Sequence, residues 1–323
     1  MTRTTPLPDS LLDRPFTVGE ARAAGVNRGR LRRSDLESPT HGARVARVAR
    51  VAPPADETPS ERRARLREEL VLRVQHLAPA LTVDQFFSHD TALALLGAPL
   101  PYGSGAALPI HVSAHRPAGQ PRRREVVGHR LQARPVAEWI AAGVRVEHPV
   151  RAWRQVAVTW GLDDLIAAAD HLVSPRVRFA TVDDLRAEVA MLGDLPGGIL
   201  QRALAEVRVG AETAEETAVR LLITRAGLPE PELNWTLHTR EGRFVARLDL
   251  AYPAYRVAIE HDGRVHAFDE RQFARDADRW DDVRAQGWTH VRILSHHLRP
   301  DPAVALDRIV TALLSHGWRP PRR

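Results

Sequence analysis

The stretch RLDLAYPAYRVAIEHDGRVH, residues 247–266, decides the fold of the C-terminal third of the chain. It consists of two mostly apolar runs, which are separated by the segment Tyr252-Pro253-Ala254, whose composition is typical of a turn. A similar run precedes it and is joined to it through Gly242. The pattern predicts three consecutive strands: 232–239, 243–251 and 255–262.

Three carboxylates lie near the ends of two of these strands. Asp249 is near the end of the second strand, and Glu260 and Asp262 are near the end of the third. Residues two apart on a strand point to the same face, so Glu260 and Asp262 should project together. Asp249 belongs to the neighbouring strand, and its distance from Glu260 depends on strand geometry that the sequence does not fix. For any one of these residues alone, a turn or an exposed strand end is a sufficient explanation.

Carboxylates that converge repel one another, and folded proteins usually hold them around a divalent cation. Mg²⁺ prefers oxygen ligands and keeps several water molecules, one of which can act as a nucleophile. A phosphodiester is the natural substrate for such a site, because the cation offsets the charge that develops during hydrolysis. Asp249, Glu260 and Asp262 are therefore expected to bind Mg²⁺ or Mn²⁺. His266 follows closely and is the expected base.

The segments on either side of the three strands complete the expected domain. The pattern predicts helices at 212–226, 268–286 and 301–315 and a strand at 288–294. Glu216 lies on the first of these helices, near two other glutamates. The second helix alternates arginine and aspartate, so its arginines could contact phosphates or pair with aspartates of the same helix.

Residues 247–266, together with QFARDADRWDDVRAQGWTHVRIL at 272–294, resemble a family of domains of unknown function. That family is related to the very-short-patch-repair mismatch endonucleases, a branch of the PD-(D/E)XK nucleases. The likeness covers about residues 210–318. The family's motif positions fall on Glu216, Asp249, Glu260, Asp262, His266, Asp276, Arg279 and Arg292.

The resemblance implies a restriction-endonuclease-like fold and a metal-dependent endonuclease with DNA as its substrate. The catalytic residues would be Asp249, Glu260, Asp262, His266 and Glu216. The chain departs from the general nuclease pattern in one respect, because Asp262 stands where the usual lysine would be. In the repair branch a histidine takes over part of the role of that lysine, which favours His266.

Arginine supplies all the basic side chains of this protein. The chain has 46 lysine and arginine residues, and every one is an arginine, giving a formal net charge of +6. A genome rich in G and C explains the absence of lysine, but no step of any mechanism here can use a lysine amine. The positive charge fits a nucleic-acid partner. In the C-terminal domain, the expected nucleic-acid contacts are Arg275, Arg279 and Arg292.

The first fifty residues have the outline of a small DNA-binding module. Thr17 and Glu20 form a capping-box pattern for a helix at 17–24, and a second short helix is expected at 28–35. A strand at 43–48 would form a wing, which gives a winged helix-turn-helix. A basic helix in a structural domain is the alternative. The expected nucleic-acid contacts are Arg28, Arg30, Arg32, Arg33 and Arg44.

The middle of the chain reads as an α/β region. The pattern predicts helices at 60–76, 86–96, 150–160, 163–172 and 183–191 and strands at 110–114 and 125–131. Four histidines, His89, His111, His115 and His129, are scattered through this region. Their spacing matches no metal-ligand motif, so they are expected to be structural.

Four motifs of the N-terminal half occur in an order that resembles the AbiEi-type antitoxins of type IV toxin–antitoxin systems. They are FTVGEARAAGVNRGRLRR at 16–33, SPTHGARVA at 38–46, FSHDTALALLGAPLP at 87–101 and HPVRAWRQVA at 148–157. The likeness covers about residues 12–175. It implies a winged helix-turn-helix followed by an α/β domain, with DNA binding or autoregulation. An antitoxin would also need a partner toxin, which the sequence does not identify.

These observations predict a mixed α/β (α+β) protein with three domains: 1–58, 59–205 and 206–323. With no cysteine, disulfides and thiolate metal sites are excluded. No apolar run has the length of a membrane span and the start lacks a signal-peptide core, so a cytoplasmic protein is expected. Duplex DNA is the expected partner, and RNA is an alternative substrate. A non-catalytic regulator or antitoxin that only binds DNA is the alternative function.

Overall fold

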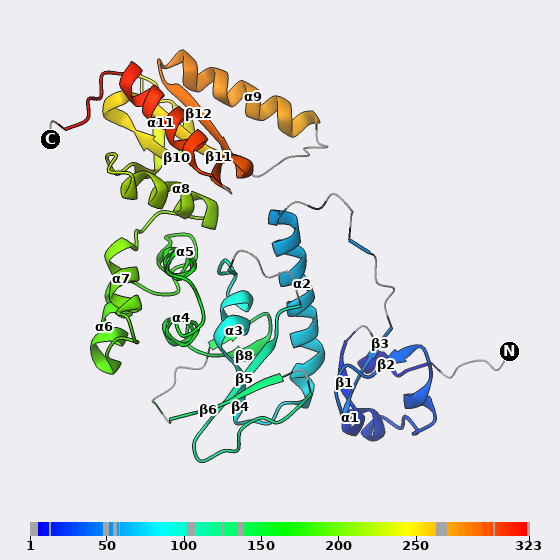
Figure 1. The fold of residues 1–323 in the computed structure, drawn as a ribbon. Helices are drawn as coiled ribbons and strands as arrows, with labels where there is room; N and C mark the ends of the chain where they lie inside the picture. The colour runs from blue at the N-terminus through cyan, green and yellow to red at the C-terminus, as the bar shows by residue number, and fades with distance from the viewer. Residues whose placement is uncertain are drawn as a thin grey trace. The chain divides into compact units, whose positions relative to one another are not determined.

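The computed structural model describes residues 6–12, 14–47, 52–53, 57, 59–101, 107–124, 126–132, 134, 139–262, 270–299 and 301–321; the side chains of 59, 60 and 270–277 lie outside this description. Over these residues the protein is a mixed α/β structure with eleven α-helices and three sheets. The chain forms two compact units, residues 1–158 and 159–323 (Figure 1). In the described part, no helix is long and apolar enough to cross a membrane.

The first unit begins with a small three-stranded sheet and one short helix. The predicted capping box is confirmed, because the Glu20 amide donates to Thr17 Oγ1 and the Thr17 amide donates to the Glu20 carboxylate. Phe16 and Ala21 are fully buried beneath the helix. The sheet has the order β1-β3-β2. The elements are η1 Asp9–Leu11, β1 Phe16–Thr17, α1 Val18–Ala23, η2 Arg30–Arg32, β2 Leu36–Glu37 and β3 Ala43–Ala46.

The predicted second helix at 28–35 is wrong, because only the 3-10 turn η2 forms there. The Asn27 side chain accepts from the Arg30 amide at 2.9 Å, and both terminal nitrogens of Arg30 donate to Asp35, at 3.0 and 2.8 Å. This forked ion pair holds the chain in a tight turn. Leu36 then enters strand β2 instead of continuing a helix.

The rest of the first unit is a five-stranded sheet of order β6-β5-β4-β8-β7. Strands β5 and β6 are parallel, and β4 pairs antiparallel with β5. The predicted strands at 110–114 and 125–131 are confirmed. The elements are α2 Pro59–Leu77, η3 Ala78–Ala80, β4 Gln85–Phe87, α3 His89–Leu95, β5 Ile110–His115, β6 Val126–Leu131, β7 Trp139–Ala141, β8 Val144–Val146 and α4 Pro149–Val156.

The helix predicted at 86–96 is wrong at its start. Phe86 and Phe87 belong to β4, where they pair with Ser113 and Val112, and Phe87 is 1% exposed. Pairing with β5 holds these two residues in the sheet, so the helix begins only after Ser88.

The second unit begins with four helices, among which α5 packs against both α7 and α8, and α6 packs against α7. These are α5 Leu162–Val173, α6 Val182–Leu192, α7 Ile199–Glu206 and α8 Ala214–Arg225. The packing between α5 and α8 contains a buried ion pair: Arg220 Nη2 donates to Asp170 Oδ2 at 2.7 Å, and both side chains are 1% exposed. Thr217 Oγ1 and the Arg208 amide also donate to the Asp170 carboxylate, at 2.9 and 2.7 Å.

A four-stranded sheet of order β12-β11-β10-β9 follows. The three strands that come first in the chain, β9, β10 and β11, form an antiparallel meander. After α9, strand β12 pairs parallel with β11. The three strands predicted from residues 232–262 are confirmed. The elements are β9 Glu232–His238, β10 Phe244–Tyr252, η4 Pro253–Tyr255, β11 Val257–Asp262, α9 Glu270–Ala285, β12 Thr289–Leu294, α10 Ser295–Leu298 and α11 Ala303–Ser315.

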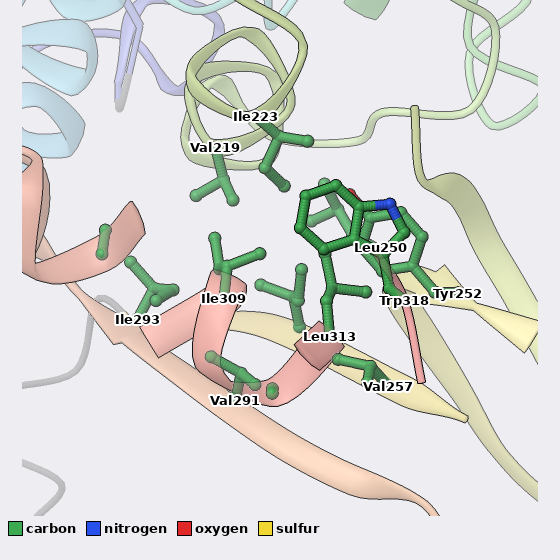
Figure 2. Close-up of a cluster of buried hydrophobic side chains, with 13 residues drawn as sticks. Val219, Ile223, Leu250, Tyr252, Val257, Val291, Ile293, Ile309, Leu313 and Trp318 are labelled. Atoms are coloured by element: carbon green, nitrogen blue, oxygen red, sulfur yellow. The ribbon is translucent and has the colours of Figure 1, made fainter. Parts of the chain in front are cut away.

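Two cores cover the two faces of this sheet. On one face, Val219 and Ile223 of α8 and Ile309 and Leu313 of α11 converge with strand residues and Trp318 (Figure 2). On the other face, Trp280 and Val283 of α9 pack with small strand residues. The sheet is therefore enclosed by helices on both faces.

Candidate functional site

The register of β10 and β11 brings two of the predicted acidic residues together. Leu250 pairs with Ile259, and Ala251 pairs with Ala258. Asp249 and Glu260 are the next residues beyond the first of these pairs, and the negative charge of Glu260 acts on Asp249. The sequence alone did not fix this pairing.

Glu260 faces the helix α9. Ala258, two residues earlier on the same strand, packs with Trp280 and Val283 in the core beneath that helix, and Ile259 packs into the opposite core. Arg279 of α9 reaches Glu260, donating from Nη2 to Oε1 at 2.6 Å. The guanidinium of Arg279 also lies 4.5 Å from the centre of the Trp280 ring.

Asp249 has an unusually high affinity for a proton. Its pKa rises from 3.8 to about 7, first through burial and then through the negative charges of Glu216 and Glu260. The positive charge of Arg279 opposes this rise without cancelling it. The neighbouring carboxylates oppose the ionisation of Asp249. A cation bound among them would stabilise its charged form.

Glu216 approaches this group from the first turn of α8. It is 6% exposed, and burial raises its pKa. Its two oxygens accept from the Glu212 amide at 2.8 Å and from Thr213 Oγ1 at 3.0 Å. These hydrogen bonds tie Glu216 to the start of the helix. The same contacts would fix the orientation of its carboxylate if it acted as a ligand.

Asp262 pairs with an arginine of the neighbouring parallel strand. Arg292 of β12 donates to the Asp262 carboxylate, which is 23% exposed. Arg292, which the sequence analysis expected to contact nucleic acid, is thus engaged by a carboxylate of the candidate site. His266 lies outside the described residues, and so do the side chains of Arg275 and Asp276.

One residue near this site was missed in the sequence. His290 of β12 stacks on Trp280, with ring centres 3.4 Å apart and planes within 3°. Its Nε2 lies 3.4 Å from Glu260 Oε2 without forming a hydrogen bond. The signal was present in the strand predicted at 288–294, because His290 and Arg292 are two residues apart and so share a face.

The candidate site offers carboxylate oxygens as ligands in partly buried, negatively charged surroundings. Asp249, Glu260 and Glu216 fit a hard divalent cation such as Mg²⁺ or Mn²⁺ in their donor chemistry. Their oxygens are not gathered closely: among the described residues, the only group of three possible ligands within 4.8 Å consists of histidines of the first unit. Mg²⁺ keeps several water ligands, so it needs few direct protein contacts.

The arginines expected to contact DNA in the N-terminal part fall into two groups. Arg30 is 9% exposed and bound to Asp35, and Arg44 donates to the Leu31 carbonyl and to Ser38 Oγ. These two maintain the fold of the module. The side chains of the other three predicted contacts are exposed: Arg28, Arg32 and Arg33.

Comparisons with known proteins give a partial relationship. The chain is 34% identical over 103 residues to an uncharacterized protein of Mycobacterium tuberculosis strain CDC 1551, and equally to one of strain H37Rv. The match covers 32% of this chain and 38% of each relative. No family model matches the chain, and no solved structure matches it. The chain is thus similar to these proteins over one segment.

Proposed function

We propose that this protein is a metal-dependent endonuclease that hydrolyses phosphodiester bonds of DNA at the Asp249–Glu260 site. The observation that carries the proposal is the grouping of three carboxylates from two strands and a helix, in which Asp249 lies partly buried near Glu216 and Glu260 and its pKa is raised. The order of the elements gives further support. A helix bearing Glu216, a meander bearing Asp249 and Glu260, an arginine-rich helix and a parallel strand follow the order of motifs in the repair-endonuclease family.

In this proposal Asp249 and Glu260 hold Mg²⁺ or Mn²⁺, and Glu216 and Asp262 complete the acidic surroundings. The bound cation would offset charge on the phosphate and lower the pKa of a water molecule. Arg279 orients Glu260 through its 2.6 Å hydrogen bond. His266 is the proposed base from the resemblance, and among the described histidines His290 places its Nε2 3.4 Å from Glu260 Oε2.

The N-terminal module would supply DNA binding in this proposal. Arg28, Arg32 and Arg33 are exposed, and phosphate contacts require side chains that are accessible. The resemblance to AbiEi-type antitoxins favours a role of this module in DNA binding as well. In the second unit, the predicted DNA contacts are Arg275, Arg279 and Arg292. Two of them, Arg279 and Arg292, are paired with carboxylates in this structure.

A non-catalytic DNA-binding regulator is the second candidate. One observation favours it: Glu260 and Asp262 are already paired with arginines, Arg279 and Arg292. Such pairing is what a nuclease fold without a cation would adopt to neutralise its acidic residues. A regulator would bind its DNA equally well with and without Asp249.

Nicking of supercoiled plasmid by the full-length protein tests the proposal. Wild-type protein should nick the plasmid with Mg²⁺ or Mn²⁺, and both EDTA and the variant Asp249→Asn should abolish nicking. Asp183→Asn is the matched control, because Asp183 is an exposed carboxylate, 87% accessible, on α6. Retained DNA binding by Asp249→Asn would show that only chemistry is lost. No cutting of plasmid, mismatched duplex or single strands with either metal would favour the regulator.

A further inference from the structure

Three histidines of the first unit, far apart in the sequence, meet at one place. His89 begins α3, His111 lies on β5 and His129 lies on β6. One ring nitrogen of each lies within 4.8 Å of one ring nitrogen of both others. Their sequence separations of 22 and 18 residues hide this grouping, since the parallel pairing of β5 and β6 creates it. His129 pairs with Ser113, which shares a strand face with His111.

The nitrogen separations suit a shared metal ion. Two nitrogens bound to one ion at about 2.1 Å lie about 3.0 Å apart at a right angle and about 3.4 Å apart at the tetrahedral angle. His111 Nδ1 and His129 Nε2 are 2.9 Å apart and share a hydrogen bond, which a bound ion would replace. The three rings lie within 25° of parallel, so binding would turn them until their lone pairs converge.

The second nitrogen of two of the rings lies near an oxygen that could accept a hydrogen bond from it. His111 Nε2 lies 3.5 Å from Asp90 Oδ2 and has no hydrogen-bond partner, although it is buried. His89 Nδ1 lies 2.9 Å from Ser88 Oγ, which receives a hydrogen bond from Ser113 Oγ at 2.6 Å. Metal-binding histidines usually donate their other ring N–H to a carboxylate or another oxygen, which fixes the tautomer. Asp90 and Ser88 are in position for this role.

The backbone at His89 is held in an unfavourable conformation. Its φ is 51°, in the left-handed region that residues with a Cβ seldom adopt. Such strain is maintained only where the surroundings determine it, and it is concentrated at functional sites. The His89 amide donates to Gln155 Oε1 at 3.1 Å, which ties this conformation to α4. The strained residue is thus one of the three that meet.

We propose that His89, His111 and His129 bind one divalent transition-metal ion, with Zn²⁺ as the first choice. The ligand atoms are His89 Nε2, His111 Nδ1 and His129 Nε2, and a water molecule takes the remaining position. Imidazole nitrogens suit Zn²⁺, Co²⁺ and Ni²⁺, whereas Mg²⁺ and Ca²⁺ prefer oxygen ligands. Burial lowers the pKa of all three histidines, which favours the uncharged form that binds a metal. The site lies in the first unit and does not depend on the proposed nuclease activity.

Cobalt titration of the full-length protein tests this site. The protein is first treated with a chelator and carries Asp249→Asn and Glu260→Gln, so that the acidic site of the second unit does not contribute. One equivalent of Co²⁺ should produce the visible absorption bands of nitrogen-coordinated cobalt, and one equivalent of Zn²⁺ should abolish them. His129→Ala should weaken binding about 100-fold or more, and Asp90→Asn should weaken it about 10-fold.

His115→Ala is the matched control, because His115 lies on the same strand and its ring packs 4.9 Å from that of Phe86, outside the group of three. It should bind cobalt like the parent protein. Zn²⁺ should also raise the melting temperature of the parent protein and of His115→Ala, but not that of His129→Ala. Circular dichroism of the metal-free variants checks that each is folded. A parent protein that binds no Co²⁺, or a folded His129→Ala that binds it equally well, would overturn the proposal.

Discussion

At the scale of single residues, the site depends on carboxylates that destabilise one another. Glu216 and Glu260 raise the proton affinity of Asp249, and Arg279 compensates for part of their charge. Proteins keep such groups where function requires them, since each could be replaced by a neutral residue at a gain in stability. Stability and activity should therefore respond in opposite directions to substitution at Asp249.

The first prediction concerns pH. The pKa of Asp249 is about 7 in the folded protein and 3.8 in the unfolded chain, so between these values the folded state binds more protons. The free energy of unfolding should fall as pH rises through this range without metal. Urea unfolding at about pH 4.5 and about pH 8 should show a fall about 2 kcal/mol larger in wild type than in Asp249→Asn, allowing for partial exposure. Equal pH slopes in the two proteins would contradict the raised pKa.

The second prediction concerns the buried pair of Asp170 and Arg220. Asp170→Ala leaves a buried guanidinium without its partner and should lower the free energy of unfolding by about 3–5 kcal/mol. Asp163→Ala is the matched control, because it removes an exposed ion pair, to Arg225, between the same two helices α5 and α8. It should cost less than about 1 kcal/mol. Similar losses in both variants would show that burial does not distinguish the two pairs.

At the scale of elements, sequence patterns succeeded where a segment's own residues determine its structure. The meander was predictable because its apolar runs are bounded by turn residues such as Gly242 and Pro253. The patterns failed at 86–87, where pairing with the distant strand β5 decides the outcome. They also failed at 28–35, because the helical pattern does not show the local ion pair of Arg30 with Asp35. The patterns also did not predict the contact of His290 with Glu260 or the group of three histidines, because strand register brings these side chains together.

The third prediction concerns Gly128 on β6. A Cβ atom there would lie 1.9 Å from the carbonyl oxygen of Pro121, so the chain at Pro121 must move to admit it. Gly128→Ala should lower the free energy of unfolding by roughly 1–3 kcal/mol. Gly119→Ala is the control, because no atom lies within 4 Å of a Cβ there. Chemical denaturation compares the two, and an unchanged Gly128→Ala would mean that the segment moves without cost.

At the scale of the whole molecule, positive charge carried only by arginine should govern DNA binding. The fourth prediction is that affinity for duplex DNA falls steeply with salt. Replacing Arg28, Arg32 and Arg33 together by alanine should reduce the slope of log K against log salt by up to about 3, since each phosphate that an arginine neutralises adds roughly 0.9 to the slope. Arg186→Ala, which removes an exposed arginine of the second unit, should leave the slope unchanged. Fluorescence anisotropy with a labelled duplex measures both.

The candidate site was predictable from the sequence only in part. The three carboxylates were named from their residue types and positions, but the closeness of Asp249 to Glu260 depends on the register of β10 and β11, whose last pair, Leu250 with Ile259, adjoins both residues. The pairing of Arg279 with Glu260 and of Arg292 with Asp262 was not predictable, because it crosses between elements. The residue types thus indicate the kind of chemistry, and the topology of the sheet decides which residues lie together in one site.

The buried pair of Asp170 and Arg220 also limits how this gene can change by recombination. The two residues are 50 positions apart, and one without the other leaves a buried charge uncompensated. A crossover with a divergent relative anywhere between these positions would separate them. Such a chimera would keep its fold only if the incoming segment brought an equivalent partner. Tolerated breakpoints in chimeras of this protein should therefore lie outside 170–220, so that Asp170 and Arg220 are exchanged together.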